Sequence, residues 1–288
     1  MLNEAIATED LCKKYGSITA VKNLNLKVYA GELFGFLGPN GAGKTTTIRI
    51  LTTLAKPTSG RAWVMGFDVV EEPAEVRKTI GVVQQHLSLD RSLTVKENME
   101  LRARLHKLPL VERKKRISEL LEYTELSEHA NRLVDELSGG LQKRAAIACV
   151  LIHEPRVLFL DEPTAGLDAH ARRRMWDLIR RLNADGVTIF LTTHYIEEAE
   201  ALCHRVGIIN GGSLIALGNP MELRSKVGLC TVVTMANNGE VSYHYFPSRE
   251  EATKYIQGLP NNLKAIVVRE SNLEDVFIEL TGRRIGEE

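Results

Sequence analysis

The sequence of 288 residues lacks several features that would place a protein quickly in a broad class. It has no excess charge, because 37 basic residues balance 37 acidic ones, so no overall field attracts nucleic acid or anionic lipid. We therefore expect no nucleic-acid partner. Cysteines are few, and none is spaced as a Cys-x-x-Cys pair, which favours buried, reduced thiols in a cytosolic protein. They are Cys12, Cys149, Cys203 and Cys230.

Long apolar runs are also missing. The longest strongly apolar stretch, residues 145–152, is far shorter than the ~20 residues that a membrane-spanning helix needs. The first ten residues contain neither a basic region nor an apolar segment, so we expect no secretory signal. Apolar content of 44% and charged content of 26% are ordinary for a soluble globular protein. If the chain serves a membrane, we expect it to act from one side.

What the sequence does contain is a glycine-rich loop between the apolar run Leu33–Leu37 and a helical segment. Glycines at this position let backbone N–H groups approach an anion, and the following helix points its positive end at the same place. Lys44 suits the β- and γ-phosphates of a nucleotide, and Thr45 suits a magnesium ion. This is a P-loop, which kinases, GTPases and ATPases share. It comprises Gly38, Pro39, Asn40, Gly41, Ala42, Gly43, Lys44, Thr45 and Thr46.

A second glycine-bearing helix start lies at Ser138, Gly139 and Gly140, ahead of the apolar residues 145–152. It offers a hydroxyl, backbone N–H groups and a helix dipole to an anion. An ordinary helix cap explains it equally well. Tyr15, in a turn upstream of the P-loop, is likewise ambiguous, because a surface aromatic is by itself the commoner interpretation than a platform for adenine.

Two carboxylates follow the short apolar strand expected at residues 157–160. Asp161 and Glu162 lie at the carboxyl end of that strand, where they are costly unless they handle a cation or a proton. With a P-loop present, Asp161 is predicted to hold magnesium opposite Thr45, and Glu162 to take a proton from an attacking water. His194 ends another apolar strand, where it can donate a hydrogen bond to a γ-phosphate or to that water.

In their order and spacing, these motifs resemble the ATP-binding cassette of an ABC transporter over residues 1 to about 220. The resemblance implies catalytic roles for Glu162 and His194, and for Gln85 as a sensor of magnesium and of the membrane partner. It implies that Tyr15 stacks on adenine and that Asp168 crosses between subunits. Two departures from the commonest pattern, Leu141 in place of glutamine and Gln84 in place of proline, remove no expected phosphate ligand or base.

The resemblance also implies an ATPase that binds ATP and Mg²⁺ and works as a dimer. Two cassettes bind face to face, so Ser138, Gly139 and Gly140 complete the partner's site in trans, in a homodimer or with a paralogous cassette. A separately encoded membrane-spanning permease is the implied partner, at the cytoplasmic face of the membrane. The alternative is a soluble ABC ATPase of translation or DNA repair, but such proteins resemble fused cassettes or contain long coiled coils, which this sequence lacks.

The implied fold class is α/β: a mixed, mainly parallel sheet with an antiparallel β subdomain and a helical subdomain at about residues 90–153. We expect this cassette to span residues 1–222 and a small α+β appendage to span residues 223–288. In the appendage, Asn237-Asn-Gly239 predicts a hairpin, and Ser248 and Ser271 are predicted to cap two helices. The closing residues 272–282 resemble the tail of bacterial export ATPases of the drug-resistance type.

Overall fold

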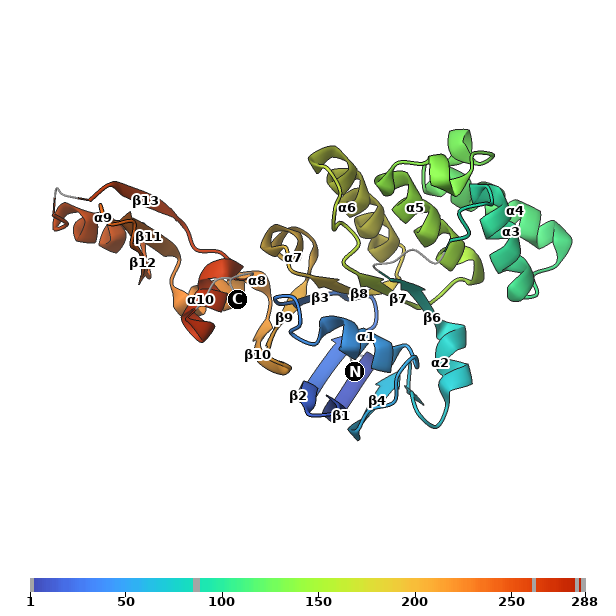
Figure 1. Cartoon of the computed structure of the whole chain (residues 1–288), viewed down its shortest axis with the longest axis horizontal. Coiled ribbons are helices and arrows are strands. Elements are labelled where there is room, and N and C mark those ends of the chain that lie inside the picture. The colour runs from blue at the N-terminus through green and yellow to red at the C-terminus, as the bar shows by residue number, and fades with distance from the viewer. Residues whose placement is uncertain (1–2, 85–88, 261–262, 283–284, 286–288) are drawn as a thin grey trace.

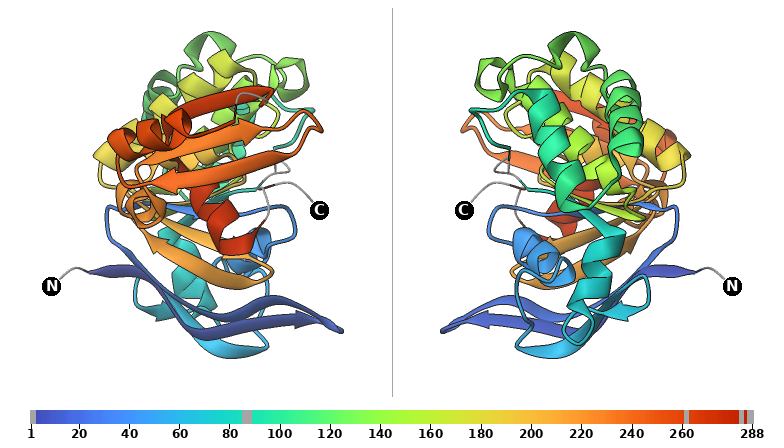
Figure 2. Two further views of the ribbon diagram at one scale, coloured as in Figure 1. Left: turned by 90° about the vertical axis from the view of Figure 1, so that its left-hand side faces the viewer. Right: turned by 90° about the vertical axis from the view of Figure 1, so that its right-hand side faces the viewer.

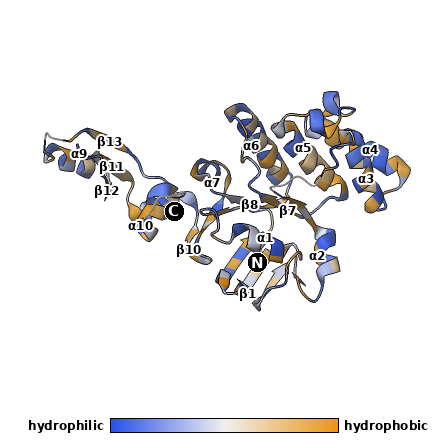
Figure 3. Cartoon of the chain, in the orientation of Figure 1, coloured by the Kyte–Doolittle hydropathy of each residue, from blue (hydrophilic) through white to orange (hydrophobic). Residues whose placement is uncertain are grey.

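The computed structural model describes residues 3–84, 89–260, 263–282 and 285, and its centre is a six-stranded sheet. The strand order is β10-β9-β3-β8-β7-β6; all neighbours are parallel except the β9–β10 hairpin. Parallel strands are buried on both faces, which explains the continuous apolar runs in β3, β7 and β8 (Figure 3). The bounds are β3 Leu33–Leu37, β6 Ile80–Val83, β7 Val157–Asp161, β8 Thr188–Thr193, β9 Arg205–Asn210 and β10 Ser213–Gly218.

An antiparallel sheet lies beneath the central sheet in Figure 1, with helix α1 (Lys44–Leu51) between them. Its order is β2-β1-β4-β5, and its long strands alternate buried apolar with exposed polar residues. The two sheets share a core in which Phe34, Phe159 and Phe190 are fully buried. The bounds are β1 Glu4–Tyr15, β2 Ile18–Tyr29, β4 Ser59–Val64 and β5 Phe67–Asp68, followed by α2 Pro73–Thr79.

Helices cover the other face of the central sheet. A helical group, α3 (Val95–Leu105), α4 (Leu110–Tyr123) and α5 (Gly139–Val150), extends to the right in Figure 1, and α6 (Ala169–Ala184) and α7 (Ile196–Leu202) complete the layer. A capping box starts α3: the Thr94 hydroxyl accepts a hydrogen bond from the Glu97 N–H, and the Thr94 N–H donates one to the Glu97 carboxylate. None of the helices in the described ranges is both long and apolar enough to cross a membrane.

The C-terminal part contains a third, small sheet that stands away from the other two in Figure 1 and faces the viewer in the left view of Figure 2. Its order is β12-β11-β13, and α9 packs on it through Ala252. In contrast, α8 and α10 pack on the main core through residues such as Leu223 and Phe277. The bounds are α8 Pro220–Val227, β11 Cys230–Met235, β12 Val241–Phe246, α9 Arg249–Gln257, β13 Ala265–Glu270 and α10 Leu273–Thr281.

The predictions for the C-terminal part are confirmed in two cases and wrong in one. The hairpin at residues 237–239 and the Ser248 cap of α9 are confirmed. Ser271 as the cap of α10 is wrong: Asn272 caps that helix in a box with Asp275, and the Ser271 hydroxyl instead lies 2.8 Å from that of Thr231. The amide of Asn272 reaches two backbone N–H groups, which makes it the better cap. The short helices α2 and α8 escaped prediction. Cys149, Cys203 and Cys230 are buried and free, as expected.

Phe190 is the aromatic on which the shared core depends, because its ring lies 5.5–5.6 Å from those of Phe34, Phe36 and Phe159. We expect Phe190→Ala to lower the free energy of unfolding by about 3–5 kcal/mol, since it leaves a cavity among three rings. Urea denaturation followed by circular dichroism measures this loss. Phe190→Leu should cost less, because it keeps more of the buried volume; equal losses would contradict this packing account.

Candidate active site

The P-loop occupies residues 38–43, between the end of β3 and the start of α1. The Gly38 N–H donates to the Thr193 carbonyl at 3.2 Å, so the loop begins beside the end of β8. A Cβ at Gly38 would lie 2.2 Å from the Ile209 carbonyl oxygen, and one at Gly43 would lie 2.4 Å from that of Ala20. These two glycines therefore let the loop pack tightly against β9 and β2. Gly43 also has a φ of 108°, which strongly favours glycine.

Lys44 starts α1 and has its ammonium group turned into the loop. Its Nζ donates to the carbonyl oxygens of Gly38, at 2.8 Å, and Pro39, at 3.0 Å, and lies 3.3 Å from a carboxylate oxygen of Glu162. Burial lowers the pKa of Lys44, and the nearby Glu162 carboxylate opposes that shift. The loop thus holds a positive charge at the place where the sequence predicts the phosphates of a nucleotide.

Asp161 and Thr45 meet at the mouth of this loop. The Thr45 hydroxyl donates to the two Asp161 carboxylate oxygens at 3.0 and 3.3 Å, and Thr192 donates to the same carboxylate from β8. Asp161 is buried, whereas Thr45 is exposed, so this group of oxygens is open on one side. A hydroxyl and a carboxylate are the hard oxygen donors that Mg²⁺ prefers, and they fit an ion that keeps its other positions for water and phosphates.

Glu162 and His194 form the next contact along the same edge of the sheet. His194 Nδ1 lies 3.0 Å from one Glu162 carboxylate oxygen, while the other faces Lys44. The Glu162 backbone has a φ of 51°, and its N–H donates to the carbonyl and hydroxyl oxygens of Thr192. A non-glycine residue in this region is strained, so the neighbouring strand fixes the direction of the carboxylate at some energetic cost.

Ser138 and Asp168 lie together at a second place. Ser138 caps α5 by accepting from the Leu141 N–H at 3.4 Å, and Asp168 caps α6 by accepting from the Ala171 N–H at 2.8 Å. Both line a cavity of about 260 Å³, together with Gly140. The residues described as lining this cavity include none from the P-loop. The start of α5 is therefore a separate, solvent-facing group of N–H donors, beginning at Gly139 and Gly140.

The remaining predicted site residues have varied placements. Pro39, Asn40, Gly41, Ala42 and Thr46 lie in the P-loop and the first turn of α1. Tyr15 is the last residue of β1, with 46% of its surface exposed and the Lys13 ammonium 4.9 Å from the centre of its ring. Gln85 lies outside the described residues.

The sequence interpretation missed several supporting residues. Lys143 donates to the carbonyl oxygens of Glu162 and Ala165, at 3.3 and 2.6 Å, and so holds the turn after β7. Glu198, fully buried in α7, accepts from Thr164 at 2.8 Å and from Trp176 at 3.2 Å; burial raises the pKa of its carboxyl group. Of these supporting residues, Thr192 alone could have been found from the sequence, as a hydroxyl near the end of a predicted strand. The roles of Lys143 and Glu198 depend on contacts between segments that are far apart in the chain.

Comparison with known proteins gives consistent matches. The sequence profile described as "ABC transporter" matches residues 21–165. The chain is 38% identical to the daunorubicin resistance ATP-binding protein DrrA3 of Streptomyces coeruleorubidus, covering 100% of this chain and 99% of that protein. It is 38% identical to the Nod factor export ATP-binding protein I of Rhizobium leguminosarum bv. viciae, covering 98% and 96%. A dimeric ATP-binding cassette in a post-hydrolysis state, bound to ADP and phosphate, superposes with a TM-score of 0.68 at 32% identity, covering 74% of this chain and 98% of that one.

Glycine meets two requirements in the P-loop, a positive φ and a close approach to neighbouring backbone. A pair of glycine substitutions can separate these two effects. Gly41 and Gly43 both have positive φ, but only Gly43 lacks room for a Cβ. We expect Gly43→Ala to lower the midpoint of thermal unfolding clearly more than Gly41→Ala, which bears the conformational cost alone, about 1–2 kcal/mol. Differential scanning calorimetry of the nucleotide-free variants measures both. Equal shifts would mean that the close approach to Ala20 is unimportant.

Proposed function

The chain belongs to the ABC transporter ATP-binding cassette family, and from this premise we propose that its P-loop edge hydrolyses ATP to drive a separate membrane subunit of an exporter. The observation that carries the proposal is the convergence of Lys44, Asp161, Glu162 and His194 from α1, β7 and β8. A cation for phosphates, oxygens for magnesium and a carboxylate for a proton are the parts that ATP hydrolysis needs.

Each side chain has a chemical task in this proposal. Lys44, which now contacts backbone carbonyls and Glu162, binds the β- and γ-phosphates when ATP enters. That move frees the Glu162 carboxylate to accept a proton from the water that attacks the γ-phosphorus. His194 orients this carboxylate and contacts the γ-phosphate. Thr45 and Asp161 hold Mg²⁺, with Gln85 as a further ligand; the ion offsets negative charge on the phosphates.

We infer that the second half of each site comes from a second cassette. Ser138, Gly139 and Gly140 lie apart from the P-loop of their own chain, beside Asp168, and present N–H donors to solvent. A γ-phosphate held by one chain supplies the anion that such a helix start favours. The dimeric cassette among the structural relatives supports this arrangement. Two copies of this chain, or one copy and a paralogue, therefore close on two ATP molecules, with Tyr15 stacking on adenine.

The membrane subunit, we infer, docks in a groove of about 430 Å³ between α2, β6 and α3, which we call the α2–α3 groove. Its wall includes Leu54, 59% exposed, and the stacked rings of His106 and His153, 4.0 Å apart. It also includes Gln84, the residue before Gln85 in the sequence. Docking there places the chain at the cytoplasmic face of the membrane.

We propose that the cassette spans residues 1–222, with its helical subdomain at about 90–153, and that residues 223–288 form the appendage. The separate cores of the two main sheets and of β11–β13 support this division. Because α10 packs on the main core, the proposed appendage and the cassette share core contacts at their boundary. The names of the relatives describe drug resistance and export, which supports export over the alternative of a soluble ATPase.

Glu162→Gln tests the proposed base directly. We expect ATP binding to persist and ATP turnover to fall by at least about 100-fold, because the amide cannot accept the proton from water. Turnover is measured by phosphate release, and binding by a fluorescent ATP analogue. We also expect the variant to accumulate as an ATP-bound dimer in size-exclusion chromatography. Unchanged turnover would remove Glu162 from this role.

Ser138→Arg tests the proposed dimer interface. Its long cationic side chain blocks the face opposite the partner's P-loop, so it should bind nucleotide as a monomer and fail to dimerise, even when combined with Glu162→Gln. A double variant that still dimerised would show that the start of α5 is not at the interface.

Leu54→Glu tests the α2–α3 groove. We expect it to reduce co-purification with a co-expressed membrane subunit by at least about tenfold, because a charge replaces apolar contact area in the groove. Val111→Glu on α4 is the matched control, since Val111 is 82% exposed and lies outside the lining. The melting temperature of each variant verifies its fold. Equal effects of both variants would place docking elsewhere.

A further inference from the structure

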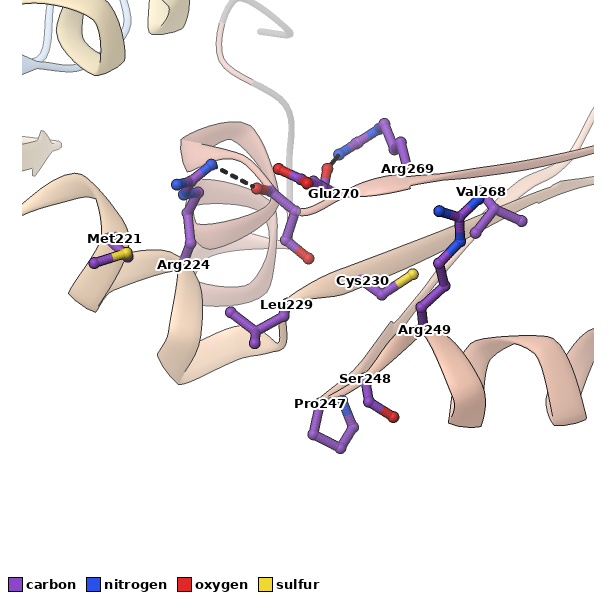
Figure 4. A pocket seen from close by; sticks show the side chains of 11 residues that line it. Met221, Arg224, Leu229, Cys230, Pro247, Ser248, Arg249, Val268, Arg269 and Glu270 are labelled. Atoms are coloured by element: carbon purple, nitrogen blue, oxygen red, sulfur yellow. Dashed lines mark hydrogen bonds between the residues drawn. The ribbon is translucent and has the colours of Figure 1, made fainter.

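A cavity of about 600 Å³ lies where the small C-terminal sheet meets α8, far along the chain from every proposed nucleotide-binding residue. Its walls come from α8, the first residues of β11, the corner between β12 and α9, and the end of β13. Figure 4 shows Arg224 on one side of the lining and Arg249 on the other, with Leu229 and Cys230 between them. We call it the Arg224–Arg249 pocket. Its size is typical of sites for small molecules.

The three arginines that line this pocket differ in how many hydrogen bonds and ion pairs their guanidinium groups make. Arg269 also lines it, but its guanidinium is paired with the buried Asp275, which raises the pKa of Arg269. Arg224 has one long hydrogen bond, 3.5 Å, to the Ser271 carbonyl, and its charge also interacts with the Glu200 carboxylate without a hydrogen bond or ion pair between them. In the part of the chain that the structure describes, no hydrogen bond or ion pair holds the Arg249 guanidinium. Glu270 is the only carboxylate among the described lining residues. Two guanidinium groups therefore remain available to an anion.

The rest of the wall is apolar and exposed. Met221 is 67% exposed, Leu229 is 54% exposed and Val268 is 40% exposed, and all three line the same cavity. Large apolar side chains gathered around one hollow indicate a binding surface more than chance exposure does. Planar guanidinium groups match carboxylate and phosphate oxygens in a bidentate manner. Beside these guanidinium groups, the exposed apolar side chains of the wall form a surface that an apolar chain can contact.

We propose that the Arg224–Arg249 pocket binds an amphipathic anion, a carboxylate or phosphate group that carries an apolar chain. The head group contacts Arg224 and Arg249, and the chain covers Met221, Leu229 and Val268. Such a ligand joins α8, which packs on the cassette, to the small sheet. This site is independent of the ATP site and requires none of its residues.

Isothermal titration of the full chain with decyl phosphate, kept below its micelle concentration, tests the proposal. We expect one molecule to bind per chain, decanoate to compete, and decyltrimethylammonium and decyl maltoside to bind at least about tenfold more weakly. The titration is repeated on Lys44→Ala, because binding that persists there does not use the P-loop. Equal binding of cationic, neutral and anionic decyl compounds would overturn the proposal.

Charge variants locate the head group. Arg224→Gln and Arg249→Gln should each weaken decyl phosphate binding about tenfold, since each removes charge-assisted hydrogen bonds. Lys254→Gln, an equal charge change at an exposed position of α9 outside the pocket, should leave binding unchanged. Glu270→Gln should tighten binding, because it removes a like charge. Unaltered binding in Arg249→Gln would refute the site.

Vesicles distinguish the two sources of such an anion. If the ligand is a lipid head group, the chain should float with phosphatidylglycerol vesicles but not with phosphatidylcholine vesicles, and Arg249→Gln should abolish flotation. If it is a free small molecule, decyl phosphate should bind with no flotation. Either result supports the shared chemistry, whereas flotation unaffected by Arg249→Gln, together with no binding of decyl phosphate, would contradict it.

Discussion

The parallel register of three buried strands is the constraint on which the proposed active site depends. Leu37 at the end of β3 pairs with Thr193 of β8, and Thr192 pairs with Asp161 of β7. This pairing brings the start of the P-loop, the oxygens proposed to bind magnesium and His194 to one edge of the sheet. A register slip of one residue would turn each of these side chains to the opposite face. The apolar residues of the strands thus position polar groups that they do not touch.

This edge of the sheet contains buried charges, which are satisfied by one another and by nearby backbone carbonyls and hydroxyls. Lys44, Asp161 and Glu162 are all buried, and each has partners from neighbouring segments. Breaking one member of such a group leaves an unpaired buried charge, which is far more destabilising than the loss of one surface ion pair. The same arrangement is poised for ATP, because a phosphate can replace Glu162 as the counterion of Lys44. Stability without nucleotide and the proposed function thus rest on the same contacts.

Local patterns in the sequence were sufficient for most of the elements and for the motifs themselves. The glycine spacing of the P-loop, the hairpin at residues 237–239 and the Ser248 cap are set by residues a few positions apart. Contacts across long separations were not predictable in this way. Thr192 with Asp161, and Lys143 with the Glu162 carbonyl, exist only because the sheet forms. Ser271 was predicted to cap α10, but its hydroxyl contacts Thr231, 40 residues away, and the adjacent Asn272 caps the helix instead.

The helix α7 connects the proposed active site to the C-terminal part of the chain through a series of hydrogen bonds. It begins two residues after His194, and its Glu198 is fixed by Thr164 and Trp176. One position on the same helix, Glu200, accepts the N–H of Leu273 at the start of α10, at 2.9 Å. Since α10 packs on α8 and on the main core, α7 and α10 form a continuous set of contacts from the segment after His194 to the base of the small sheet. The Arg224–Arg249 pocket lies at that base, so the proposed ligand would contact α8, on which α10 packs.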